Sequence, residues 1–153
     1  MLLAWILILA AVNQEMPSSS KARASEPLTA AEKSQLEREP NVEDRIRVYE
    51  AASSRIHRLI RNLIQRQEFE NVGAEMSSWL DLLSEAHKDV GQNIRRKKKS
   101  KNLIRFEIHL RKATGDLKEL KLQVPTDQQH DFESWLTRVE QVRKKFFDIL
   151  FGS

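Results

Sequence analysis

Histidines and carboxylates are the side chains of this chain that could bind a metal or transfer protons. The four histidines, His57, His87, His109 and His130, fall on four different predicted helices. A ferritin-like di-iron site would need a Glu-x-x-His pair on each of two helices, and the sequence contains no such pair. Each histidine lies beside the apolar stripe of its helix, so we expect partly exposed surface histidines.

Three acidic residues on one predicted helix have the spacing of metal ligands. Asp81, Glu85 and Asp89 follow at i, i+4 and i+8, which resembles the metal-binding helices of phosphate-uptake regulator bundles. On a helical projection, however, they point away from the apolar side that carries Trp79 and Leu83. They therefore predict a solvated outer stripe, and the sequence predicts no metal site and no cofactor.

The serines and glycines do not support nucleophilic catalysis. Ser53 with Ser54, and Ser77 with Ser78, lie in no glycine-rich elbow, and no histidine is predicted to activate them. Four glycines are too few for a phosphate-binding loop, and the absence of cysteine excludes thiolate catalysis and Cys-based metal centres. We therefore expect a protein that is not an enzyme.

Helices must position these side chains, because the chain has only four Gly and four Pro and 31% of its residues are charged. Its 153 residues, 40% of them hydrophobic, suit one domain. Apolar residues at heptad spacing predict one short and four long helices, at residues 29–39, 42–66, 69–94, 101–123 and 127–151. They predict an all-α fold, an antiparallel up-down-up-down four-helix bundle with a short extra N-terminal helix. A pair of stacked helical hairpins is the second interpretation.

Capping residues mark several of these boundaries. Thr29 and Glu32 form a capping box for the short helix, Asn41 caps the next one, and Thr126 is expected to cap the last. A tight turn is expected near residues 65–68 although no Gly or Pro marks it. Gly115 does not shift the apolar stripe of its helix, so we expect the helix to continue through it.

The N-terminal segment MLLAWILILAAV is an apolar run of twelve residues, which suits the hydrophobic region of a secretory signal but is short for a membrane span. We assign residues 1–24 to a signal peptide or N-terminal anchor plus a flexible spacer, and residues 25–153 to the helical bundle domain. A cleaved signal is the favoured interpretation, and it predicts export to the periplasm or the medium. An uncleaved membrane anchor and a cytoplasmic chain with an unusual N-terminus are the alternatives.

Three further segments carry a resemblance. They are EPNVEDRIRVYEAASSRI, KNLIRFEIHLRKATGDLKEL and VRKKFFDILFG, and the resemblance extends over most of the chain after Glu26. These segments resemble uncharacterised exported helical proteins of bacteria. The resemblance implies a bacterial origin and export, and it implies no activity.

A basic run precedes the predicted helix 101–123. Six of seven consecutive positions are basic, namely Arg95, Arg96, Lys97, Lys98, Lys99 and Lys101. From Ile94 to Val124 the chain has eleven Lys or Arg against three Asp or Glu, whereas the net charge of the whole chain is only +4. This asymmetry can steer an anionic partner toward one face of the molecule. A solvated loop is the simplest interpretation.

Four large apolar residues are expected at the same end of the bundle without a place in its core. Ile104, Ile108, Phe147 and Phe151 fall on the outer sides of their helices. The favoured interpretation is that the helix 29–39 folds over part of this surface. The alternatives are a protein partner, an anionic membrane surface next to the basic run, or a second copy of the chain.

Nucleic acid is a further candidate partner, through the basic loop 95–101 and the outer face of the helix 101–123, where Arg105 and Lys112 continue the stripe. Asp116 and Glu119 interrupt that face, and no aromatic residue lies among the cations to stack on a base. We therefore expect a non-enzymatic exported helical interaction or structural module at the bacterial cell envelope. A nucleic-acid-binding helical protein is the alternative.

Overall fold

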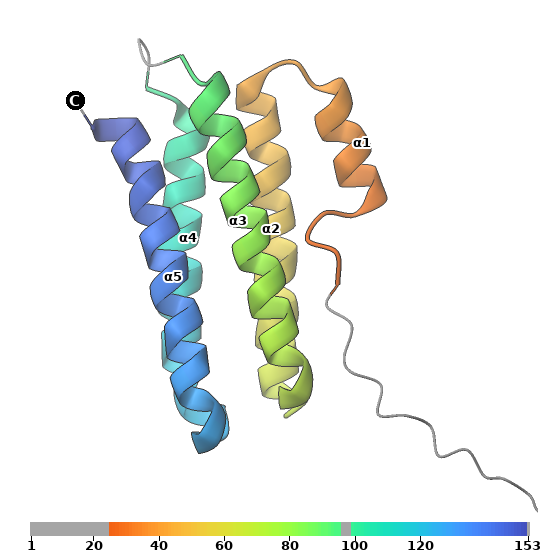
Figure 1. Cartoon of the computed structure of the whole chain (residues 1–153), viewed down its shortest axis with the longest axis vertical. Helices are drawn as coiled ribbons and strands as arrows, with labels where there is room; N and C mark the ends of the chain where they lie inside the picture. Colours follow the sequence, from red (N-terminus) through yellow and green to blue (C-terminus); the bar gives the residue numbers. More distant parts are fainter. Residues whose placement is uncertain (1–24, 96–98, 153) are drawn as a thin grey trace, which may run out of the picture.

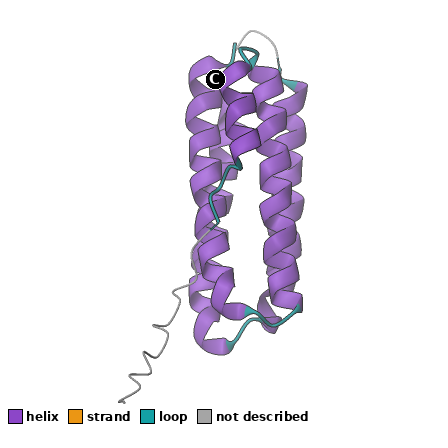
Figure 2. Cartoon of the chain, turned by 90° about the vertical axis from the view of Figure 1, so that its right-hand side faces the viewer, coloured by secondary structure: helices purple, strands orange, loops and turns teal. Residues whose placement is uncertain are grey.

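The computed structural model describes residues 25–95 and 99–152, and this part of the chain is helical without a strand (Figure 1, Figure 2). Two short 3-10 helices accompany the five α-helices. In chain order the elements are α1 (Ala30–Arg38), α2 (Val42–Gln65), η1 (Phe69–Asn71), α3 (Val72–Asn93), α4 (Lys101–Leu120), η2 (Lys121–Gln123) and α5 (Thr126–Phe151). The predicted all-α class is confirmed, and the helix ends lie within one turn of the predicted bounds.

The four long helices pack as two hairpins. The helices of each hairpin, α2 with α3 and α4 with α5, pack on each other, and the hairpins meet through α2 against α4 and α3 against α5 (Figure 1). Successive helices α3 and α4 therefore occupy opposite corners. The seven residues between Asn93 and Lys101 can span this diagonal, because an extended chain covers about 3.3 Å per residue.

Two of the three predicted N-caps are present, at Thr29 and Asn41. The Thr29 side chain and Glu32 form a capping box at α1, and the Asn41 side chain accepts a hydrogen bond from the backbone N–H of Glu43. The predicted cap at Thr126 is wrong, since Thr126 is already the first residue of α5 and Pro125 precedes it. Proline sets a φ that suits the entry to a helix, so no side-chain cap is used there.

The turn after α2 is made without glycine. Gln67 adopts a φ of 61°, and its backbone N–H donates to the carbonyl of Ile64. A positive φ is uncommon for a residue other than glycine. Because Gln67 adopts it here, the turn carries none of the Gly or Pro residues that usually mark a turn in a sequence. The helix α4 continues through Gly115 as predicted.

The short helix α1 packs against α2, on the side of the molecule away from α4 and α5 (Figure 1). Leu28 and Leu36 are buried there as part of the core cluster. The expectation that this helix covers the outer residues of α4 and α5 is therefore wrong. The reason lies in a set of polar contacts that fasten α1 to α2 and α3.

Candidate functional site

Two exposed phenylalanines stand out at the C-terminal end of α5. Phe147 is 46% exposed and Phe151 is 48% exposed, and their ring centroids lie 4.7 Å apart. The Nζ atom of Lys99 lies 4.8 Å from the centroid of the Phe151 ring. This is the geometry of a cation–π contact. It joins the basic connection between α3 and α4 to the end of α5.

An ion pair between α4 and α5 fixes which sides of these helices face each other. Glu107 of α4 accepts a hydrogen bond from Arg143 of α5. Ile104 and Ile108 lie at i−3 and i+1 from Glu107, and Phe147 and Phe151 lie at i+4 and i+8 from Arg143. In an antiparallel pair these offsets rotate both sets toward the same outer face, away from the core. Both isoleucines are half-buried. We refer to Ile104, Ile108, Phe147 and Phe151 as the α4–α5 patch.

The predicted basic residues do not all belong to this surface. Arg95, Lys99 and Lys101 are exposed at the same end of the molecule. Arg105, in contrast, turns toward α2 and pairs with Glu50 at 2.8 Å, which also raises the pKa of Arg105. The predicted contact residues Arg96, Lys97 and Lys98 lie outside the described residues.

One cation beside the α4–α5 patch was not singled out from the sequence. Lys144 precedes Phe147 by three residues and Phe151 by seven, so it shares their stripe on α5. It is exposed, and within the described chain it has no ion pair. The signal was available in the segment VRKKFF, where the two lysines come directly before the phenylalanines. Asp148 is the acidic residue next to this stripe.

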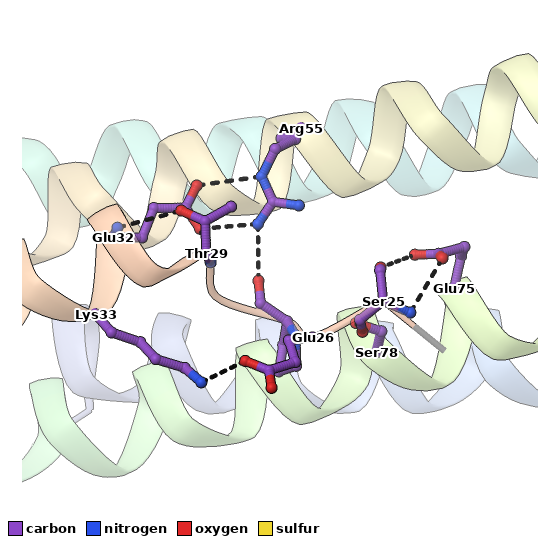
Figure 3. Close-up of polar contacts among 9 residues, drawn as sticks. Ser25, Glu26, Thr29, Glu32, Lys33, Arg55, Glu75 and Ser78 are labelled. Atoms are coloured by element: carbon purple, nitrogen blue, oxygen red, sulfur yellow. Dashed lines mark hydrogen bonds and ion pairs between the residues drawn. The ribbon is translucent and has the colours of Figure 1, made fainter. Parts of the chain in front are cut away.

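The opposite outer face, over α2 and α3, is closed by α1 and the residues before it (Figure 3). Arg55 of α2 donates to both carboxylate oxygens of Glu32, at 3.1 and 2.8 Å, and to the carbonyl of Pro27 at 2.9 Å. Ser25 donates to Glu75 of α3 at 2.5 Å, and Ser78 donates to the carbonyl of Ser25 at 2.9 Å. These contacts place α1 on α2 and α3.

A second arginine of α2 holds the other end of α1. Arg45 donates to the backbone carbonyls of Leu36 and Glu39, and it binds Asp89 of α3 at 2.6 Å. Asp89 also accepts from the Tyr49 hydroxyl at 2.7 Å, and burial together with this contact raises the pKa of Tyr49. The prediction of a solvated stripe is thus wrong for Asp89, whose side chain is only 12% exposed. Its neighbour Glu85 is exposed, as expected.

A serine and a histidine do meet, between α2 and α4. Ser53 Oγ lies 3.0 Å from His109 Nε2 and accepts a hydrogen bond from the indole N–H of Trp79 at 2.8 Å. The sequence, which predicted no histidine to activate a serine, did not predict this contact. Burial, and then the charge of His57, lower the pKa of His109 to about 4. A neutral His109 can accept a hydrogen bond from the Ser53 hydroxyl, so the polar groups of Ser53, His109 and Trp79 that meet here all have partners.

Accessibility decides what this serine and histidine can do. Ser53 is 0% exposed, so no substrate reaches its hydroxyl. The Nε2–H of His57 donates to the Asp116 carboxylate at 2.9 Å, which ties the ring to α4. The arrangement is a polar network inside the fold, and it positions α2, α3 and α4 relative to one another.

Within residues 25–95 and 99–152, no group of three or more His, Cys, Asp or Glu side chains could hold a metal ion. None of the helices in this part of the chain combines the length and the apolar character needed to cross a membrane. No family model, curated protein or solved structure matches the chain.

Proposed function

We propose that the chain is a non-enzymatic interaction module, exported to the bacterial cell envelope, built as an up-down-up-down four-helix bundle. It binds its partner through the α4–α5 patch. The observation that carries this proposal is the pair of exposed phenylalanines, Phe147 and Phe151, with Lys99 over the second ring, on a face that α1 leaves open. Apolar side chains gathered in this way on a surface are typical of a contact site.

A non-enzymatic role is supported by the burial of Ser53, the serine that contacts a histidine. Ser53 and His109 are the pair closest to a catalytic arrangement, and the Ser53 hydroxyl is bonded to His109 Nε2 and to the Trp79 indole N–H inside the fold. The substitution Ser53→Ala tests this proposal. It should lower stability, because His109 and Trp79 lose their partner, and should leave partner binding intact.

Export rests on the sequence of residues 1–24. Sequencing the N-terminus of the mature protein, recovered from fractionated cells, tests it directly. A start after residue 20 in the periplasmic or secreted fraction supports export. An intact Met1 in the cytoplasmic fraction contradicts it.

Partner contact is tested by a photo-crosslinking amino acid placed at Phe151, with the same residue at Leu122 as control. Leu122 is 84% exposed but lies in η2, at the other end of α4. We expect adducts to form in cells at position 151 and not at 122. Equal yields at the two positions, or none at 151, would contradict a contact site at the α4–α5 patch.

Nucleic acid fits the geometry less well. Arg105, in the middle of the basic stripe of α4, is neutralised by Glu50. A nucleic-acid-binding protein would bind duplex or single strands with an affinity that falls steeply with salt. We expect no such binding in a titration over a range of salt concentrations.

A further inference from the structure

We propose that the α4–α5 patch docks on the surface of an anionic lipid bilayer. This inference rests on the proposed function and names the partner class. The patch combines two half-exposed aromatic rings with the half-buried Ile104 and Ile108, and no described helix offers a membrane span. Aromatic and aliphatic side chains of this kind insert at the boundary between lipid headgroups and acyl chains.

The charges around the patch match such a surface. Lys99, Lys101 and Lys144 border the four apolar side chains, all three are exposed, and among the described residues none of them has a carboxylate partner. Asp148 is the acidic residue that shares this border. Three cations against one carboxylate attract an anionic headgroup layer and repel a cationic one.

The same charges disfavour a second copy of the chain as the occupant. In a two-fold symmetric dimer the patch would meet itself, which brings Lys99, Lys101 and Lys144 of one molecule toward the same residues of the other. Like charges placed opposite each other cost free energy at an interface. A bilayer with anionic headgroups meets every lysine of the border with an opposite charge.

The first experiment reports which end of the molecule touches the lipid. The chain has no cysteine, so a single cysteine at Asp148→Cys can carry an environment-sensitive fluorophore, with Leu122→Cys as the matched position in η2. With the full chain and vesicles of phosphatidylglycerol mixed with phosphatidylcholine, we expect a blue shift at position 148 that lipid-borne quenchers reduce. An unchanged spectrum at position 148, or equal shifts at the two positions, would overturn the proposal. The comparison holds even if residues 1–24 bind lipid themselves, because it reports orientation.

The second experiment removes the two kinds of contact separately. Phe147→Ser with Phe151→Ser is compared with Leu122→Ser, and Lys99→Glu with Lys101→Glu is compared with Arg138→Glu, an exposed cation far along α5. Each basic residue near an anionic leaflet strengthens binding roughly fivefold. We therefore expect at least a roughly tenfold loss of the blue-shifted fraction for each patch variant, and little change for each control.

These substitutions are at exposed positions, and a thermal melt identical to that of the parent chain verifies the fold. Equal binding to pure phosphatidylcholine, or equal losses in the control variants, would overturn the inference. A dimer that Phe151→Ser dissolves would also overturn it, in favour of a second copy. If position 151 crosslinks to a protein while the vesicles bind nothing, the bilayer inference fails and the proposed function stands.

Discussion

The molecule has two outer faces, one over α2 and α3 and the other over α4 and α5. Both are built from similar amphipathic helices, but they differ in whether another part of the chain covers them. The first face is covered by α1. The second face has no such cover, and Phe147 and Phe151 are exposed on it. The difference lies in directed polar contacts: Arg45 and Arg55 donate hydrogen bonds to acceptors on α1 and on Pro27, three residues before it. The exposed apolar side chains of α4 and α5 are not covered by α1. We infer that the hydrogen bonds of Arg45 and Arg55 determine which face α1 covers.

Acid should give the largest change inside the bundle, at the partly buried His109 of α4, which contacts Ser53 of α2. Its pKa is lowered to about 4 in the folded chain, so the unfolded chain binds the proton more tightly. Stability is therefore complete above about pH 6.5 and falls as the pH drops toward 4, by about 3 kcal/mol for this group. Urea unfolding at several pH values measures this slope. We expect His109→Gln to flatten it and the exposed His130→Gln to leave it unchanged.

The next largest effect is expected at the ion pair that anchors α1. Arg45→Ala leaves Asp89 without its cation and frees two backbone carbonyls, which should cost about 2–3 kcal/mol. The matched variant, Arg105→Ala, breaks the exposed pair with Glu50 on the other side of α2 and should cost much less, because a solvent-exposed pair contributes little to stability. Thermal unfolding compares the two. Equal losses would show that the Arg45 contacts contribute no more than a surface pair.

Truncating one apolar side chain on each face tests the comparison directly. Leu36→Ala removes buried packing between α1 and the bundle and should cost about 2 kcal/mol. Phe151→Ala removes a larger side chain that is half exposed, and should change stability by about 0.5 kcal/mol or less. Urea denaturation of both variants gives the two values. A large loss for Phe151→Ala would mean that the patch belongs to the core.

Effects smaller than that of Leu36→Ala are expected at two glycines that lie inside helices. A Cβ added at Gly115 has nothing within 4 Å, so Gly115→Ala should stabilise the chain by about 1 kcal/mol. A Cβ added at Gly73 would lie 2.8 Å from Cη2 of Trp135, so Gly73→Ala should be neutral or destabilising. Differential scanning calorimetry resolves the difference in stability between the two variants. Stabilisation by both substitutions would show that Trp135 moves at no cost.

The sequence predicted the helices well because heptad spacing and caps are local signals, as at Thr29 and Asn41. It did not predict which helices are neighbours. The diagonal step between α3 and α4 depends on how the hairpins pack, and heptad stripes do not encode that choice. The location of Phe147 and Phe151 on an outer face could be predicted, because it follows from helical periodicity.

The meeting of Ser53 with His109 could not be predicted in the same way. These residues are 56 positions apart, and each lies at the edge of its own stripe. Their contact depends on the relative rotation and height of α2 and α4. The prediction of where α1 packs was wrong for a related reason. In the sequence Arg45 and Arg55 resemble ordinary surface cations, and only the structure shows their partners on α1.

The Glu32 carboxylate has two tasks at once: it closes the capping box of α1 and receives Arg55 from α2. Folding of α1 and its docking are therefore one linked equilibrium, since a helix of nine residues is mostly unwound in water on its own. Any ligand that displaced α1 would have to supply the free energy of both steps. Its release would be visible as rapid deuterium uptake confined to residues 30–38, with the four long helices still protected.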